Sequence, residues 1–173
     1  MFREQLSWGW LSDMSGVDDL TVREIEYLLT VFRYSRKKGY ARQFEVLNEL
    51  NVDKSTASLM IKKLVRKGYL TTRKREIILA EKGRRAVKEI LWKHGVLENA
   101  LVKLGVSSEE ACAVTWEISN KIPREMVECI WVKLGKPDTC PCGYRFPSVD
   151  QEVDLEGFEV CLTYRKRSLA CDL

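Results

Sequence analysis

The sequence predicts a mainly α-helical chain that opens with a winged helix-turn-helix and continues into a second, helical domain. Three observations predict this fold class. Apolar residues recur at helical spacing from residue 21 to residue 67, two short β-rich runs follow at once, and a long amphipathic segment starts near residue 86. We divide the chain into an N-terminal extension (1–19), the winged helix-turn-helix (20–85), the helical domain (86–147) and a C-terminal tail (148–173).

The first helix is expected at about residues 21–37. Thr21 and Glu24 stand three apart, as in a capping box, where each side chain bonds the backbone N–H of the other residue. Gly39 can end the helix in a left-handed conformation. The apolar residues between these signals share one face: Ile25, Leu28, Leu29 and Phe32.

A short turn separates the next two helices. The segment ARQFEVLNEL predicts a second helix whose inner face carries Phe44, Leu47 and Leu50. Asp53 can cap a third helix over about residues 54–67, and Gly68 stops it. The third helix should turn inward Ala57, Met60, Ile61 and Leu64, and mostly outward Lys54, Ser55, Ser58, Lys62, Lys63 and Arg66.

A hairpin completes the winged domain. YLTT and EIIL are β-rich runs, and the charged residues Arg73, Lys74 and Arg75 join them. Three helices and a hairpin, with a short turn between the second and third helices, form the element order of a winged helix-turn-helix.

Positive charge is concentrated in this part of the chain. Residues 33–93 carry 18 Lys or Arg and 6 Asp or Glu, whereas the whole chain has a net charge of +4. Such polarisation favours a polyanionic partner, because each neutralised phosphate releases counterions. The alternative is a solvated face on a lysine-rich protein.

The helix-turn-helix pattern favours double-stranded DNA as that partner. In this motif the second helix of the pair enters the major groove, while flanking groups hold phosphates. For each side chain the alternative is ordinary surface charge. We expect base contacts from Lys54, Ser55, Thr56 and Ser58. We expect phosphate or minor-groove contacts from Arg42, Lys62, Lys63, Arg73, Lys74 and Arg75.

The order of elements resembles one known family. A winged helix, then KHGVLENALVKLGV, SSEEA and IPREMVECIWVKLGKPDTCPCGYRFP, is similar to the diphtheria-toxin-repressor family of metal-dependent transcriptional regulators, which includes iron and manganese sensors. The match covers about residues 20–147. The resemblance implies a homodimer, joined through the helices after the wing, that binds a palindromic operator when a divalent metal is bound. Independently, Ala86–Leu104 is long and amphipathic enough to supply a dimer surface.

The main regulatory metal site of that family is degenerate in this chain. The resemblance places one ligand position at Glu26 and the later ones at Trp116, Ser119 and Asn120, none of which is a good ligand. A slip in register would bring in Glu117, but the spacing back from KIPREM argues against it. We therefore do not expect manganese to be the effector.

A second, ancillary site of the family is retained in part. His94 and Glu98 share one helix face, and the resemblance places Cys112 at a third ligand position. An imidazole, a carboxylate and a thiolate suit Zn²⁺ or Fe²⁺. The alternative is an ordinary His–Glu pair on a helix surface.

The remaining cysteines suggest another centre. Cys140 and Cys142 bring two sulfurs together in a turn, where thiolates can hold zinc or an iron–sulfur cluster. Further thiols could come from Cys129, Cys161 or Cys171. A redox disulfide and inert thiols are the alternatives, and a cysteine such as Cys129 on an amphipathic helix is more often a small core residue.

Several classes of protein are excluded. One His and the lack of a phosphate loop, a nucleophile elbow or an HExxH motif argue against an enzyme. The absence of a long apolar block argues against a membrane partner or secretory leader and predicts a cytoplasmic protein. In the tail, EGFEVCLTYR is expected as one strand of a hairpin. Trp8 and Trp10 are expected to pack on the core, and the alternatives are that they pack on the dimer or flank DNA.

Two hypotheses on function remain. The first is a homodimeric DNA-binding transcriptional regulator with a cysteine-based zinc or iron–sulfur sensor. The second is an architectural or partner-bound winged-helix protein that binds DNA without an effector.

Overall fold

The computed structural model describes residues 17–148 and 155–161. Its α-helices are α1 (Val22–Ser35), α2 (Gln43–Leu50), α3 (Lys54–Arg66), α4 (Glu81–Lys103), α5 (Ser108–Ile118) and α6 (Arg124–Lys133). Its strands are β1 (Ala41–Arg42), β2 (Leu70–Arg73) and β3 (Glu76–Leu79), and short 3-10 turns lie at Val17–Asp19, Ser119–Lys121 and Leu155–Gly157. None of the described helices combines the length and the apolarity that crossing a membrane requires. The mainly α-helical fold class predicted from the sequence is therefore confirmed.

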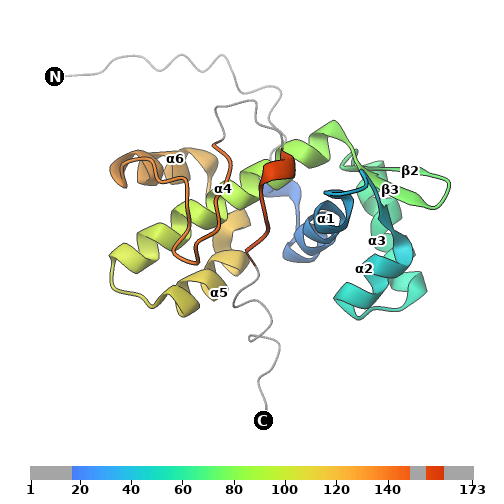
Figure 1. Ribbon diagram of the computed structural model, residues 1–173, viewed down its shortest axis with the longest axis horizontal. Helices are drawn as coiled ribbons and strands as arrows, with labels where there is room; N and C mark the ends of the chain where they lie inside the picture. Colours follow the sequence, from blue (N-terminus) through green and yellow to red (C-terminus); the bar gives the residue numbers. More distant parts are fainter. Residues whose placement is uncertain (1–16, 149–154, 162–173) are drawn as a thin grey trace, which may run out of the picture.

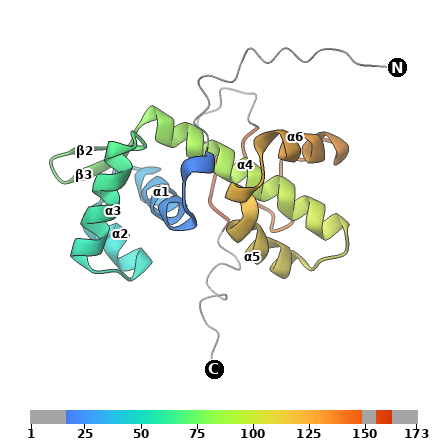
Figure 2. The same cartoon turned by 180° about the vertical axis from the view of Figure 1, so that it is seen from behind.

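The elements form two lobes joined by α4. Helices α1 to α3 and the small sheet make one end of the molecule, α5 and α6 make the other, and α4 runs between them (Figure 1). Figure 2 shows from behind how α5 and α6 lie along α4 on the side away from the wing. Because α4 begins at Glu81, the domain boundary predicted at 85/86 falls inside a continuous helix.

Local signals place the helices of the winged lobe as expected. The capping box is formed, with Thr21 N donating to Glu24 Oε2 at 2.8 Å and Glu24 N donating to Thr21 Oγ1 at 3.2 Å. Asp53 caps α3 by accepting from Thr56 N at 2.9 Å. The inward face predicted for α3 is confirmed, because its interior residues Ala57, Ile61 and Leu64 are buried.

The predicted hairpin is confirmed and gains a third strand. Strands β2 and β3 are antiparallel, and Leu70 pairs with Leu79 at the base of the hairpin. The sheet has the order β1-β3-β2, with Ala41 paired to Ile77.

Strand β1 also corrects the prediction for α2. Phe44, expected in the core, is 54% exposed, whereas Val46 is fully buried. Because Ala41 and Arg42 pair with β3, α2 begins only at Gln43, and its rotation directs Val46 inward. Leu47 and Leu50 keep their partly buried positions against the core.

The prediction that Ala86–Leu104 supplies a dimer surface is wrong for most of the helix. Nearly every residue from Ala86 to Glu98 is buried within the chain, because α1, α5, α6 and the turn Ser119–Lys121 contact α4. Large exposed apolar side chains occur instead at the end of α4 and on α5 and α6: Leu104, Val114, Met126 and Val132.

The tail also differs from its prediction. Residues 158–161 of EGFEVCLTYR form no strand. They follow the 3-10 turn Leu155–Gly157. The rest of the proposed hairpin, and Trp8 and Trp10, lie outside the described residues.

Candidate nucleic-acid interface and metal centre

The first turn of α3 presents a polar edge. Lys54, Ser55 and Thr56 are exposed and Ser58 is half-buried. Ser55 Oγ and Thr56 Oγ1 each donate to the carboxylate of Asp53 at 2.5 Å. These hydrogen bonds hold the pKa of Asp53 well below its usual range. The two hydroxyls are thus fixed in position and keep lone pairs free for donors on a base edge.

Sequence reasoning missed an apolar residue on the same face. Leu59 is 68% exposed on α3. An exposed apolar side chain on a recognition helix can contact the methyl group of thymine. The signal in the sequence was its position outside the inward-facing set of Ala57, Met60, Ile61 and Leu64.

A buried carboxylate anchors the middle of α3 to α1. Glu24 is fully buried, and its Oε1 lies 3.2 Å from Lys63 Nζ and 2.9 Å from Lys67 Nζ. Burial alone would raise the pKa of Glu24, but hydrogen bonds from Thr21 and the two lysines outweigh it and lower the pKa to about 2. The charge of Lys63, predicted as a phosphate contact, is therefore partly neutralised by Glu24, although its side chain is 45% exposed.

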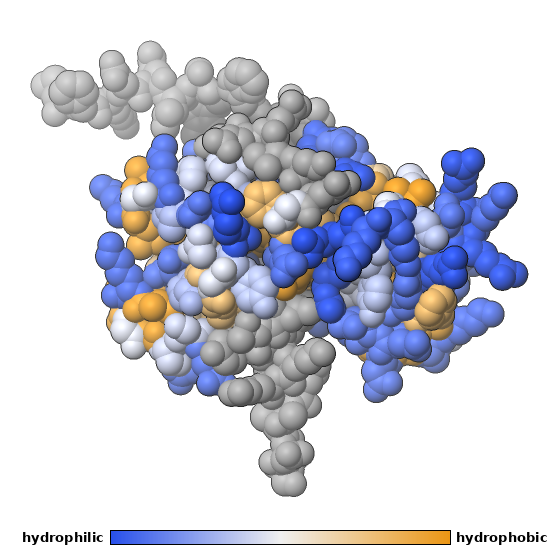
Figure 3. Space-filling view, in the orientation of Figure 1, coloured by the Kyte–Doolittle hydropathy of each residue, from blue (hydrophilic) through white to orange (hydrophobic). Residues whose placement is uncertain are grey.

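The other predicted phosphate contacts are exposed. Arg42 and Lys62 are open to solvent, as are the three residues of the wing tip. At this tip Lys74 adopts a left-handed backbone conformation with a φ of 56°, which tightens the turn between β2 and β3. Figure 3 shows that hydrophilic side chains gather over this end of the molecule.

Four separate parts of the chain bring metal-binding side chains together. We refer to these side chains as the donor cluster: His94 and Glu98 of α4, Cys112 of α5, Cys140 and Cys142 of the loop after α6, and Cys161 of the C-terminal segment. Their donor atoms form two sets, and within each set all atoms lie within 4.8 Å of one another. Both sets contain Glu98 and Cys161.

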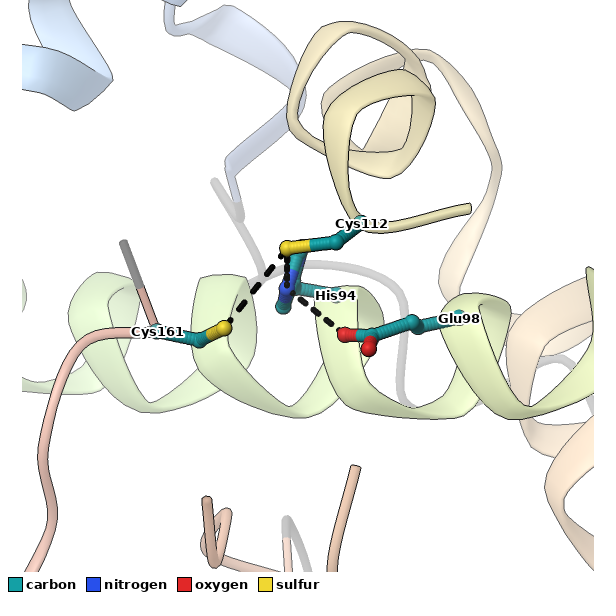
Figure 4. A group of neighbouring side chains, drawn as sticks. All are labelled: His94, Glu98, Cys112 and Cys161. Atoms are coloured by element: carbon teal, nitrogen blue, oxygen red, sulfur yellow. Dashed lines mark hydrogen bonds and ion pairs between the residues drawn. The ribbon is translucent and has the colours of Figure 1, made fainter. Parts of the chain in front are cut away.

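The first set lies in the interior with spacing suitable for a tetrahedral ion. His94 Nε2 is 3.0 Å from Glu98 Oε2 and 3.8 Å from Cys112 Sγ, and Cys112 Sγ is 3.6 Å from Cys161 Sγ (Figure 4). A tetrahedral zinc with Zn–S bonds of about 2.3 Å keeps neighbouring sulfurs about 3.8 Å apart. None of the four side chains is more than 3% exposed.

Neighbouring groups orient the imidazole. Thr115 Oγ1 donates to Cys112 O at 3.1 Å, so at its 2.9 Å contact with His94 Nδ1 it acts as acceptor. The proton on Nδ1 leaves Nε2 as the atom that faces the other donors. The ring of Trp116 stacks on His94 with centroids 3.9 Å apart and packs one side of it.

An orphaned oxygen indicates that the cluster fits a cation. Glu98 Oε2 is buried and accepts no hydrogen bond from any described residue, although it faces His94 Nε2. Two acceptor atoms 3.0 Å apart need either a shared proton or a metal ion between them. Burial lowers the pKa of His94, but contacts with Cys161 and Glu98 outweigh it and raise the pKa.

The thiols of Cys112, Cys140 and Cys142 are held in the protonated form while the cluster lacks a cation. A hydrogen bond with Cys161, together with burial, raises the pKa of Cys112 and of Cys140. Burial and a hydrogen bond with Glu98 raise the pKa of Cys142 to about 12. A bound dication reverses this balance, because it stabilises thiolates that the buried site otherwise disfavours.

The positions that the family resemblance assigns to the main site carry other interactions. Asn120 Nδ2 donates to Leu20 O at 3.0 Å, Ser119 is buried, and Trp116 covers His94. Glu26 pairs with Arg23 at 2.6 Å. Across the described part of the chain, only the two sets of the donor cluster bring three or more donors together.

Two of the cysteines considered from the sequence stand apart. Cys129 is exposed on α6 and belongs to neither set, and Cys171 lies outside the described residues. Sequence reasoning treated the ancillary site and the cysteine centre as separate. The structure joins them, because Cys161 reaches both.

Comparisons with known proteins identify the family of both lobes. Residues 19–77 match the family described as iron dependent repressor, N-terminal DNA binding domain, and residues 80–148 match its metal binding and dimerisation domain. The transcriptional regulator MntR of Geobacillus kaustophilus is 33% identical over 85 residues, which cover 49% of this chain and 60% of that relative. The chain thus spans about three fifths of the length of this curated relative.

Solved structures share the fold. A hypothetical protein from Sulfolobus solfataricus superposes with a TM-score of 0.69 at 28% identity, covering 75% of this chain and all of that one. A manganese-dependent transcriptional repressor in complex with manganese superposes with a TM-score of 0.63 at 25% identity, covering 76% of this chain and 61% of that one.

Proposed function

Because this chain belongs to the iron-dependent repressor family of DtxR/MntR-like transcriptional regulators, we propose that it is a homodimer that binds a palindromic DNA operator in response to a soft metal. The base contacts come from the start of α3, and phosphate contacts come from the wing tip and the other exposed cations of the lobe. The exposed apolar residues of α5 and α6 support the homodimer, because they lie in the region that matches the dimerisation domain.

One observation carries the metal response. The donor cluster is largely buried and contains four thiols, and its buried Glu98 Oε2 faces His94 Nε2 at 3.0 Å. Thiolates and imidazole suit zinc or ferrous iron far better than manganese, which prefers oxygen ligands. An iron–sulfur cluster bound by the same thiols is the alternative to a single zinc or ferrous ion.

The C-terminal segment gives the cluster a route to the DNA-binding lobe. Arg36, at the end of α1, pairs with Glu159 at 2.9 Å, and Leu155 lines a small pocket together with Phe32 and Leu79. Cys161 of the same segment enters the donor cluster. Metal binding at Cys161 therefore fixes one end of a segment whose other end contacts the winged lobe, and loss of the metal releases it.

Operator binding tests the proposal. Protein purified without oxygen is used to select a duplex from a random library, and its affinity is then measured by fluorescence anisotropy with Zn²⁺, with Mn²⁺ and with a chelator. We expect zinc to tighten binding by about tenfold or more over the chelated protein, within the usual range of allosteric coupling.

Matched variants locate the response. Cys161→Ser should lose the zinc response, whereas Cys129→Ser, which changes an exposed thiol outside the cluster, should keep it. Equal affinity with zinc and with chelator would instead support constitutive binding by a winged-helix protein without an effector.

A further inference from the structure

We propose that the donor cluster is a centre for two ions, in which Glu98 and Cys161 bridge two zinc-like dications. This inference rests on the proposed function only in taking the donor cluster as the metal site. It adds the number of ions and the separate roles of the six side chains.

The composition of the two sets supports two ions. One set holds His94 and Cys112, the other holds Cys140 and Cys142, and each reaches four donors only by including Glu98 and Cys161. Four protein donors complete a closed tetrahedral zinc site. One tetrahedral ion uses only four of the six donors. Two sets of four donors that share Glu98 and Cys161 match two ions bridged by these two residues.

The shared residues are the types that can bridge. A carboxylate has two oxygens and a thiolate has several lone pairs, whereas an imidazole nitrogen has one. His94, which cannot bridge through Nε2, belongs to a single set. The chemistry of each side chain thus agrees with its membership in one set or in both.

The two oxygens of Glu98 face different sets. Oε2 lies 3.0 Å from His94 Nε2 in the first set. Oε1 accepts a hydrogen bond from the backbone N–H of Cys142, in the second set, at 3.2 Å. The carboxylate therefore offers one oxygen to each ion without changing its rotamer.

Cys161 occupies the corresponding position among the sulfurs. Its Sγ is 3.6 Å from Cys112 Sγ in the first set. It also contacts the thiols of Cys140 and Cys142 in the second set. A thiolate at this point lies next to both ions.

Charge balance is compatible with the same stoichiometry. Four thiolates and one carboxylate bring five negative charges into a largely buried site. One dication in the first set, with the thiols of Cys140 and Cys142 protonated, leaves a net charge of −1. Two dications on all six donors leave the same −1, so the second ion replaces two protons without adding uncompensated charge to the interior.

Metal stoichiometry of the full chain tests the proposal. Reduced protein is loaded anaerobically with Zn²⁺, passed over a chelating resin, and its metal content is measured by mass spectrometry. We expect about two zinc ions per chain in the parent and in Cys129→Ser. Cobalt titration should raise the thiolate-to-cobalt absorbance until two equivalents are bound.

Variants separate bridging from terminal donors. Cys112→Ser and Cys142→Ser each remove a donor from one set, so each should retain about one ion. Cys161→Ser and Glu98→Gln remove a donor from both sets, so each should retain close to none. Circular dichroism verifies that every variant scored is folded, and the parent measurement stands without any variant.

The outcomes are distinct from those of the proposed function. One zinc per chain in the parent, or iron together with inorganic sulfide, overturns the two-zinc centre even if DNA binding responds to metal. Two zinc ions per chain support the centre even if operator affinity is the same with metal and with chelator.

Discussion

The buried carboxylate of Glu24 leads to a quantitative prediction about acid stability. It accepts hydrogen bonds from Thr21 N at 2.8 Å and from Thr21 Oγ1 at 3.0 Å, and it contacts Lys63 and Lys67. These interactions exist only in the folded state and lower its pKa from 4.5 to about 2. A carboxylate with a depressed folded pKa stabilises the protein above its unfolded pKa and loses that contribution as the pH falls toward the folded pKa.

The magnitude follows from the same contacts. The difference between 4.5 and about 2 corresponds to about 3 kcal/mol of folding free energy. Solvent weakens the two ion pairs, because the side chains of Lys63 and Lys67 are 45% and 27% exposed. We therefore expect Glu24→Gln to lower the free energy of unfolding by about 2 kcal/mol at pH 7.

Urea unfolding of the parent and the variant between pH 7 and pH 2.5 measures this effect, with chelator present so that metal release does not contribute. The gap in unfolding free energy should be constant above about pH 5 and should shrink between pH 4.5 and pH 2. Glu26→Gln, which removes a more exposed carboxylate paired with Arg23, should cost less than about 1 kcal/mol. A gap for Glu24→Gln that is as large at pH 3 as at pH 7 would refute the linkage.

Three further outcomes are expected. Replacing Arg73, Lys74 and Arg75 by Ala should weaken binding to every DNA sequence. The slope of log affinity against log salt should fall by about one for each phosphate contact that the substitutions remove. An unchanged slope would place the wing away from DNA. In Gly95→Ala the new Cβ would lie 2.1 Å from the Phe146 ring, so steric strain should outweigh the gain in helix propensity of about 1 kcal/mol. Urea unfolding should therefore show a net loss of about 1–2 kcal/mol in the free energy of unfolding. Unchanged stability would mean that the ring moves aside freely. Mn²⁺ added to protein from which a chelator has removed the metal should leave operator affinity unchanged, because four thiols dominate the donor cluster. Tighter operator binding with Mn²⁺ would instead indicate a working oxygen-rich metal site.

Features that depend on neighbours in the chain were predictable from the sequence alone. The capping box at Thr21, the cap at Asp53 and the hairpin around residues 73–75 depend on residues a few positions apart. Their physics is local, so spacing and residue type are sufficient. The same holds for the inward face of α3.

Only the tertiary structure decided features that depend on distant contacts. Pairing of β1 with β3 turned Val46 inward, and packing of other helices buried most of α4 between Ala86 and Glu98. The donor cluster is the clearest case, because a segment near the C-terminus delivers Cys161 to side chains of α4 and α5. Periodicity and motif spacing describe one segment at a time, whereas these arrangements arise from which segments fold against one another. The sequence determined which donors are present, and the fold determined that they form one centre.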